Sequence, residues 1–116
     1  MSFEKSSRNI PLNAGNVTIL RAECQQRNGK WRWSSIILDA FVGSVDGDFR
    51  VGGWNFTTNA TNVRLCGGTL LVALLRIDGS KYVPAASDLS LYIENIDGHL
   101  TAVNIPPDTF VVSPSF

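Results

Sequence analysis

The feature that most constrains this fold is an internal repeat, because the second half of the chain restates the first at a spacing of 50 to 53 residues. The clearest match pairs Val45-Asp46-Gly47 with Ile96-Asp97-Gly98, and each triplet is followed by a polar residue and an apolar one. Other matched pairs are Phe3 with Phe56, Asn9 with Asn62, Leu12 with Leu65, Leu20 with Leu70, Gly29 with Gly79, Trp31 with Tyr82 and Leu38 with Leu89. A chain of 116 residues that contains one unit twice is expected to form two equivalent halves with two equivalent surfaces.

Length and charge exclude several classes of protein. The chain is long enough for one compact domain with a core that needs no metal or cross-link. Ten basic residues balance ten acidic ones and no basic cluster occurs, so we expect no nucleic-acid partner. No apolar run approaches the length of a membrane span. Residues 1–8 are polar and lack the apolar core of a signal peptide, which predicts a cytoplasmic protein.

The two cysteines, Cys24 and Cys66, stand at non-equivalent places in the repeat. A duplicated disulfide is therefore not expected, although a single cross-link between them is an alternative. We favour two unpaired thiols, as is typical of proteins from a reducing compartment.

Apolar periodicity predicts an all-β fold, since short alternating runs are common and no stretch keeps a helical pattern for three turns. Asn-Gly and Asp-Gly dipeptides tolerate positive φ and predict tight turns. These dipeptides are Asn28-Gly29, Asp46-Gly47, Asp78-Gly79 and Asp97-Gly98. Each half is then expected to contain a three-stranded antiparallel sheet and a short hairpin. Single helical turns are expected at Ser34-Ser35, at Pro84-Ala85-Ala86 and at the starts of segments 2–9 and 55–62.

The alternation also predicts which side chains are buried. Residues 19–24 place Leu20, Ala22 and Cys24 on the inner face of a strand. The equivalent segment 70–74 is apolar on both faces. We expect its inner face to carry Leu70, Val72 and Leu74, and its outer face, with Leu71 and Ala73, to be covered by another element.

The two halves meet at residues 51–54, where two adjacent glycines can swivel, so this segment is the predicted hinge. A hinge between duplicate halves also permits exchange of halves between two molecules. We expect a monomer, with such an exchanged dimer as the alternative. Residues 105–116 have no counterpart in the repeat and are expected to form a tail.

Residue types give little support for catalysis or metal binding. The single histidine, His99, lies beside a turn without the partners of a nucleophilic triad. Two thiols and one imidazole do not make a zinc site. Asp46-Gly47-Asp48 begins like a calcium loop, but Arg50 stands where another oxygen ligand is needed. We therefore predict no enzyme activity, no metal and no cofactor. The three tryptophans are candidates for stacking on sugars or bases, although we expect at least two of them to pack in the core or hinge.

A chain of motifs in order carries a family resemblance. It comprises Ser2 to Asn9, Leu20 to Gln25, Asn28 to Trp31, Ser34 to Ile36, Leu38-Asp39, Val45 to Gly47, Gly52-Gly53 with Asn55-Phe56, and Ile93 to Gly98. Together these motifs resemble the cyanovirin-N homology (CVNH) family of mannose-binding lectins. The resemblance covers residues 2 to about 103 and leaves only the tail outside it.

The resemblance implies a pseudo-symmetric fold in which the two repeats, 1–54 and 55–104, exchange segments. Half-domain A would contain residues 1–40 with 91–104, and half-domain B would contain residues 41–90. The family binds terminal α(1→2)-linked mannose in a shallow pocket at each end. Mannose-containing oligosaccharides are therefore the partners that the resemblance implies.

The resemblance also assigns pocket residues. In half-domain A they are Lys5, Ser6, Gln25, Arg27, Glu94, Asn95, Asp97 and Gly98. In half-domain B they are Gly43, Ser44, Asp46, Asn55, Thr58, Asn59, Arg76 and Asp78, with the register from Leu75 to Asp78 open by one residue. Gly43 and Ser44 stand where half-domain A has Glu94 and Asn95, so two side-chain partners shrink or vanish. We therefore expect the pocket of half-domain A to bind and that of half-domain B to be weak or silent.

The sequence departs from the best-known family members in its sulfur content. Ser7 and Ala60 occupy positions where those members have disulfide cysteines, and Cys24 thereby loses its partner. This pattern is similar to the disulfide-free members found in fungi and favours a cytoplasmic protein. The alternative function is a protein-interaction module on the same fold with decayed sugar sites, for which Phe110-Val111-Val112 would be a contact strip.

Overall fold

The computed structural model describes residues 3–8 and 10–106, and this part of the chain is all-β, as predicted. Four short 3-10 turns accompany the strands, and no described helix is long and apolar enough to cross a membrane. The strands are β1 (Ser7–Arg8), β2 (Leu12–Ala14), β3 (Thr18–Gln25), β4 (Trp31–Ile37), β5 (Val42–Val45), β6 (Asp48–Val51), β7 (Ala60–Cys66), β8 (Leu70–Asp78), β9 (Lys81–Asp88), β10 (Ile93–Ile96) and β11 (His99–Ala102). The 3-10 turns are η1 (Phe3–Ser6), η2 (Leu38–Ala40), η3 (Phe56–Asn59) and η4 (Leu89–Leu91).

Each half contains one antiparallel sheet and one hairpin. In the first sheet β3 pairs with β4 on one side and with the short strands β1 and β2 on the other. The second sheet has the order β7-β8-β9. The hairpins are β5–β6 and β10–β11. The predicted three-stranded sheet and hairpin per half are therefore present, with the outer strand of the first sheet broken into two pieces.

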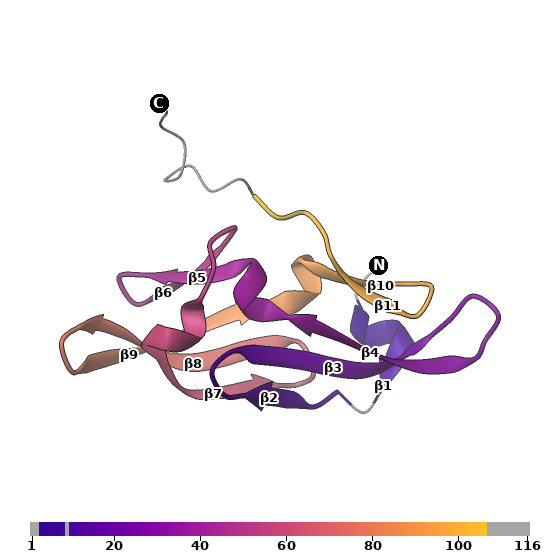
Figure 1. Ribbon diagram of the computed structural model, residues 1–116, viewed down its shortest axis with the longest axis horizontal. Coiled ribbons are helices and arrows are strands. Elements are labelled where there is room, and N and C mark those ends of the chain that lie inside the picture. Colours follow the sequence, from indigo (N-terminus) through magenta and orange to yellow (C-terminus); the bar gives the residue numbers. More distant parts are fainter. Residues whose placement is uncertain (1–2, 9, 107–116) are drawn as a thin grey trace.

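The hairpins have exchanged places between the repeats. Hairpin β10–β11 lies against β3, β4 and η1, whereas hairpin β5–β6 lies against β9 and η3. Figure 1 shows the two sheets side by side in one layer and the two hairpins in a second layer above them. Each hairpin thus covers the sheet of the other repeat, which is the exchange of segments that the family resemblance implies. The repeat and half-domain boundaries themselves stay a prediction.

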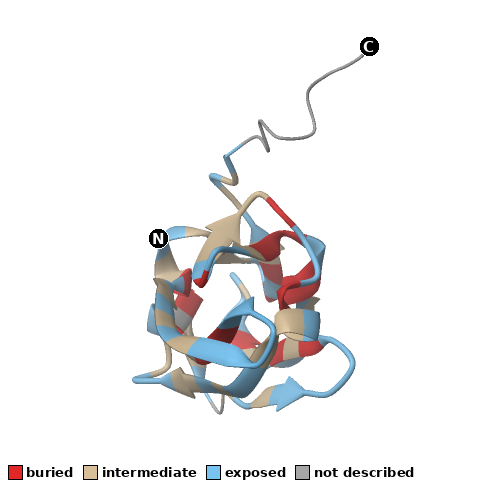
Figure 2. Cartoon of the chain, turned by 90° about the vertical axis from the view of Figure 1, so that its left-hand side faces the viewer, coloured by how far each residue is buried: buried red, intermediate tan, exposed pale blue. Residues whose placement is uncertain are grey.

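The core forms between these two layers, and Figure 2 shows the buried segments gathered on the inner side of the strands. On β3 the predicted inner residues Leu20, Ala22 and Cys24 are fully buried. The remaining members of the buried cluster are Phe3, Leu38, Phe41, Val42, Phe56, Leu71, Ala73, Leu75, Leu89, Ile93 and Leu100. These residues come from both repeats, so neither half has a separate core.

The predicted facing of β8 is wrong by one residue. Leu71, Ala73 and Leu75 are buried, whereas Leu70 is 37% exposed. Leu71, not Leu70, is therefore the equivalent of Leu20. Alternation could not decide the register, because residues 70–75 are apolar on both faces.

The tight turns were predicted more accurately than the helical ones. Asp46 and Gly47 both have positive φ, as do Asp97 and Gly98, which is typical of type I′ hairpin turns. Of the expected helical turns, those at the starts of segments 2–9 and 55–62 are η1 and η3.

The other two expected helical turns are wrong. Ser34-Ser35 belongs to β4 and Pro84-Ala85-Ala86 belongs to β9. Strand β9 is an edge strand, where the missing N–H of Pro84 can face away from the sheet. The serine hydroxyl of Ser34 accepts a hydrogen bond from the backbone N–H of Leu100 at 3.0 Å, which links β4 to the hairpin above it.

A buried carboxylate joins the two halves. Asp39, in η2, is only 4% exposed. Its Oδ1 accepts hydrogen bonds from the backbone N–H of Thr18 (2.6 Å) and from Thr57 Oγ1 (2.7 Å), and its Oδ2 accepts one from the backbone N–H of Thr57 (3.0 Å). Its own carbonyl accepts from the N–H of Asn55 at 2.9 Å. One side chain therefore ties the start of β3 to η3, across the boundary between the sheets.

Both cysteines are unpaired, as predicted. Cys24 is buried, and this burial raises the pKa of its thiol, whereas Cys66 is exposed. Ser7 and Cys24 face each other across β1 and β3, and Ser7 Oγ lies 3.5 Å from Cys24 Sγ.

The tryptophans pack less than expected. Trp31 is half-buried beneath Arg8, whose guanidinium lies 3.9 Å from the centroid of a Trp31 ring. Trp33 and Trp54 are 46% and 55% exposed, so the prediction that at least two tryptophans pack inside is wrong. The apolar strip Phe110-Val111-Val112 lies outside the described residues.

We expect Asp39→Ala to lower the free energy of unfolding by about 3 kcal/mol or more, because buried donors left without an acceptor each cost roughly 1–3 kcal/mol. Asp88→Ala is a suitable control, since the exposed Asp88 side chain accepts hydrogen bonds from Ser90, its neighbour in the adjoining 3-10 turn. Loss of that cap should cost about 1 kcal/mol. Urea denaturation checks both values, and equal losses in the two variants would contradict the role given to Asp39.

We expect Ser7→Cys to form a disulfide with Cys24 under oxidising conditions, because the two residues already oppose each other. The disulfide would close a loop between residues that are 17 positions apart, which should raise the free energy of unfolding by about 3 kcal/mol. Thermal denaturation with and without a reducing agent measures the gain. A melting temperature that does not respond to reduction would show that the two side chains do not meet.

Candidate functional site

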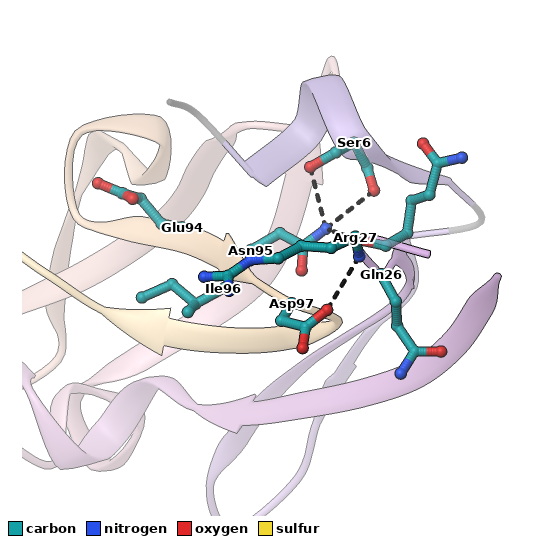
Figure 3. Close-up of a pocket in the computed structure, with 8 residues that line it drawn as sticks. Ser6, Gln26, Arg27, Glu94, Asn95, Ile96 and Asp97 are labelled. Atoms are coloured by element: carbon teal, nitrogen blue, oxygen red, sulfur yellow. Dashed lines mark hydrogen bonds between the residues drawn. The ribbon is translucent and has the colours of Figure 1, made fainter. Parts of the chain in front are cut away.

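A cavity of about 370 Å³ opens at one end of the molecule. It lies where η1, the end of β3 and the β10–β11 turn come together (Figure 3). Three segments that are far apart in the sequence therefore build one site. The lining residues are Ser6, Gln25, Gln26, Arg27, Glu94, Asn95, Ile96 and Asp97.

Asn95 holds the walls of this cavity together. Its Nδ2 donates to the backbone oxygen of Ser6 (3.2 Å), to Ser6 Oγ (3.0 Å) and to the backbone oxygen of Gln25 (2.9 Å). Its Oδ1 accepts from the N–H of Gly98 at 2.8 Å. Because its amide hydrogens are already engaged, Asn95 positions the three segments rather than offering donors to a ligand.

Asp97 fixes the opposite wall. Its Oδ1 accepts a hydrogen bond from the backbone N–H of Arg27 at 2.9 Å, which joins the β10–β11 turn to the β3–β4 turn. The residue is exposed and has a φ of +48°, a conformation that Asp tolerates better than most residues. Its second carboxylate oxygen has no hydrogen bond among the described residues, so it is available to a donor in the cavity.

Two long side chains line the cavity with polar groups that no described residue engages. The side-chain amide of Gln26 and the guanidinium of Arg27 have no hydrogen-bond or ion-pair partner within residues 3–8 and 10–106. Figure 3 shows the Arg27 side chain lying across the cavity. Gln25 differs, because its Nε2 turns away to donate to the backbone oxygen of Gly29 at 3.3 Å.

Gly98 lies behind these groups and is buried. A Cβ placed on it would come within 2.6 Å of Arg32 Cδ and 2.7 Å of Gln26 Cγ. Its φ of +87° also favours glycine. The turn can therefore press against the β3–β4 hairpin only because this position has no side chain. Arg32 in turn lies 3.4 Å from Nε2 of His99, so the single histidine is part of this support.

Most of the residues predicted for the pocket of half-domain A do meet in this cavity. Ser6, Gln25, Arg27, Glu94, Asn95 and Asp97 line it. Gly98 supports it from behind, and Lys5 is exposed on η1 without being part of the lining. Whether these residues bind a sugar stays a prediction.

Gln26 and Ile96 line the cavity but were missed. Gln26 follows the last residue of β3, where the alternation of the strand ends and the side-chain direction can no longer be read from the sequence. Ile96 sits between two predicted residues, and its apolar side chain gave no signal for a polar site.

The equivalent end of half-domain B is built differently. Arg76 Nη2 donates to Asn59 Oδ1 at 2.7 Å, and Thr58 Oγ1 donates to the backbone oxygen of Asn55 at 2.8 Å. A bulge between Arg76 and Asp78 accounts for the register that the sequence left open. Asp78 and Asp46 are both exposed, at the end of β8 and in the β5–β6 turn.

Three positions explain why this end lacks the network seen around Asn95. A Cβ on Gly43 would lie 2.9 Å from the backbone nitrogen of Trp54. A side chain larger than that of glycine therefore does not fit at this position, where half-domain A has Glu94. Ser44 replaces Asn95, and its side chain makes no hydrogen bond to any described residue. The turn glycine Gly47 rests on methyl carbons of Ile77 and Val83, each of which would lie 2.5 Å from a Cβ placed on that glycine. Half-domain B therefore repeats the turn of the site without the hydrogen-bond network that Asn95 forms in half-domain A.

The sequence matches the model of a known protein family. The CVNH domain model matches residues 3–101. The chain belongs to the CVNH family. A cyanovirin-N homolog of Tuber borchii is 35% identical over 102 residues, which cover 86% of this chain and 97% of the relative. A cyanovirin-N homolog of Neurospora crassa is 30% identical over 109 residues, with 88% and 98% of the two chains covered.

Solved structures agree with this assignment. The structure of the Tuber borchii protein superposes with a TM-score of 0.77 at 33% identity, covering 88% of this chain and 99% of that one. Microvirin, solved as a complex with mannobiose, gives a TM-score of 0.77 at 27% identity, with 87% and 97% covered. Proteins of the CVNH family are carbohydrate-binding lectins and not enzymes. Within the described residues, no group of three His, Cys, Asp or Glu side chains could hold a metal ion.

We expect Gly98→Ala to distort the cavity, since the methyl group would collide with Gln26 and Arg32. The loss in unfolding free energy should be about 2–4 kcal/mol, from positive-φ strain and overpacking together. Gly79→Ala is the matched control, because that turn glycine also has positive φ but has nothing within 4 Å of its Cβ position. Urea denaturation compares the two, and an equal loss would show that the Gly98 contact is unimportant.

Proposed function

We propose that this protein is a lectin for terminal α(1→2)-linked mannose of high-mannose glycans, and that it binds them mainly through the cavity of half-domain A. The observation that carries the proposal is a cavity whose backbone is held by Asn95 and whose lining includes polar groups of Gln26, Arg27 and Asp97 that no described residue engages. The mannobiose complex of microvirin, a structural relative, supports a disaccharide of this kind as the ligand.

The free groups suit a neutral sugar. A mannose hydroxyl both donates and accepts, so it can donate to the unengaged oxygen of Asp97 while it accepts from Arg27 or Gln26. Hydrogen bonds to charged groups contribute about 1.5–3 kcal/mol each, against about 0.5–1.5 kcal/mol for neutral ones. Water competes for every one of them in an open cavity. A single site of this type should therefore bind with roughly millimolar to micromolar affinity.

Half-domain B is proposed to contribute little. Its turn glycine rests on aliphatic carbons, Ser44 makes no bridge between segments, and Arg76 is already engaged by Asn59. Without a second working site, a branched glycan gains nothing from effective concentration. We accordingly expect one disaccharide to bind per chain.

The decisive variants are at Asp97. Asp97→Ala should abolish binding of α(1→2)-mannobiose, because it removes both the sugar acceptor and the bond that holds Arg27. Asp97→Asn can keep an oxygen for the Arg27 N–H but loses the charge. We expect it to weaken binding by about 10- to 100-fold, which corresponds to about 1.4–2.8 kcal/mol.

Titration of the disaccharide into labelled protein, followed by residue-resolved NMR, measures both effects. Asp46→Ala, at the equivalent turn of half-domain B, is the control and should bind normally. Unchanged shift perturbations in Asp97→Ala would refute the assignment. Perturbations centred on Asp46 and Asn59 would move the site to the other half-domain.

A protein-interaction module is the second candidate. The outer face of β8 favours it, because Leu70 is exposed and Val72 and Leu74 are only half-buried opposite Ala86 and Pro84. A glycan array separates the two functions. Absence of any mannose signal at high protein concentration would favour the module.

A further inference from the structure

The segment that follows the last strand lies over the predicted hinge. The backbone N–H of Val103 donates to the carbonyl of Tyr92 at 2.8 Å, just as the N–H of Gly52 donates to the carbonyl of Phe41 at 2.8 Å. Val103 is therefore the structural equivalent of Gly52. In the first repeat the chain continues from this point into the second repeat, whereas here it continues toward the C-terminus.

Asn104 directs this continuation. Its φ of +54° lies in the left-handed region, which Asn adopts more readily than most residues. After this bend Ile105 packs against the buried cluster and Pro106 reaches the hinge. In Figure 1 the yellow segment leaves β11 and passes toward the loop that follows β6.

The contact with the hinge is close. A Cβ placed on Gly52 would overlap the carbonyl oxygen of Pro106. Gly52 also has a φ of +104°, a conformation that is strained for any other residue. The closed hinge and the bend at Asn104 therefore fit each other at one point. On the C-terminal side of this contact, Asn104 and Pro106 lie beyond residues 3–101, which the CVNH model matches.

In an exchanged dimer, each half of one chain would pack on the half of the second copy that replaces its own partner half. Such a dimer would keep almost every contact of the monomer. The hinge is the exception, since its backbone must open for the chain to cross over. Interactions that need the closed conformation of Gly52 thus decide between the two forms. The contact with Pro106 is one of them.

We propose that residues 103–106 act as a clasp on the hinge, and that this clasp keeps the chain a monomer by holding Gly52 in its closed conformation. When the clasp is released, the partner is a second copy of this chain, which exchanges halves through residues 51–54. The proposal does not depend on the sugar-binding function, because it involves neither Asp97 nor Asn95.

Substitutions at Asn104 in the full-length protein test the clasp. Asn104→Val disfavours the left-handed bend because Val is β-branched, and Asn104→Gly keeps it. After refolding at high concentration, light scattering should show a dimer fraction several-fold higher for Asn104→Val than for the natural chain, and unchanged for Asn104→Gly. Equal dimer fractions in all three proteins would overturn the proposal.

Gly52→Ala provides an independent test of the same contact, because it introduces the group that overlaps the Pro106 carbonyl. It should also raise the dimer fraction, whereas Pro106→Ala, which keeps that carbonyl, should not. The dimer should differ from the monomer in amide chemical shifts only near residues 50–55 and 103–106. Shift changes spread over β8 and β9 would indicate an ordinary surface dimer and would also overturn the clasp.

Discussion

The rest of the structure depends on the buried carboxylate of Asp39. It ties β3 of the first repeat to η3 of the second through three hydrogen bonds, and its backbone carbonyl adds a fourth. A buried charge is costly unless each of its oxygens is engaged, so its two threonine partners are held in one arrangement. That arrangement sets how the halves meet, and hence how each hairpin reaches the sheet of the other repeat.

The exchange of hairpins explains why the candidate site is assembled from three distant segments. Asn95 and Asp97 arrive on β10 and its turn, whereas Ser6 and Arg27 belong to the first repeat. A repeat folded on its own would have no such site. Sugar binding in this family member is therefore proposed to require the interlocked fold, not one repeat alone.

Apolar alternation and the turn dipeptides allowed the all-β fold to be predicted from the sequence, whereas most of the cavity residues were assigned by the family resemblance. Asp97-Gly98 predicted its turn because few other pairs adopt positive φ twice. The facing of β8 could not be predicted, since residues 70–75 are apolar throughout and only pairing with its neighbours decides the register. Gln26 was missed because its direction depends on where β3 ends. The saturation of Asn95 depends on backbone oxygens, which no sequence pattern reveals.

That saturation has a consequence for association kinetics. Because the Asn95 amide is engaged before any ligand arrives, the framework of the site is pre-organised. The exposed side chain of Arg27 and the half-buried one of Gln26 still have rotamer freedom to lose. A low affinity of such a site would result from fast dissociation of the saccharide rather than from slow association. One protein molecule would then bind many glycan ends in succession.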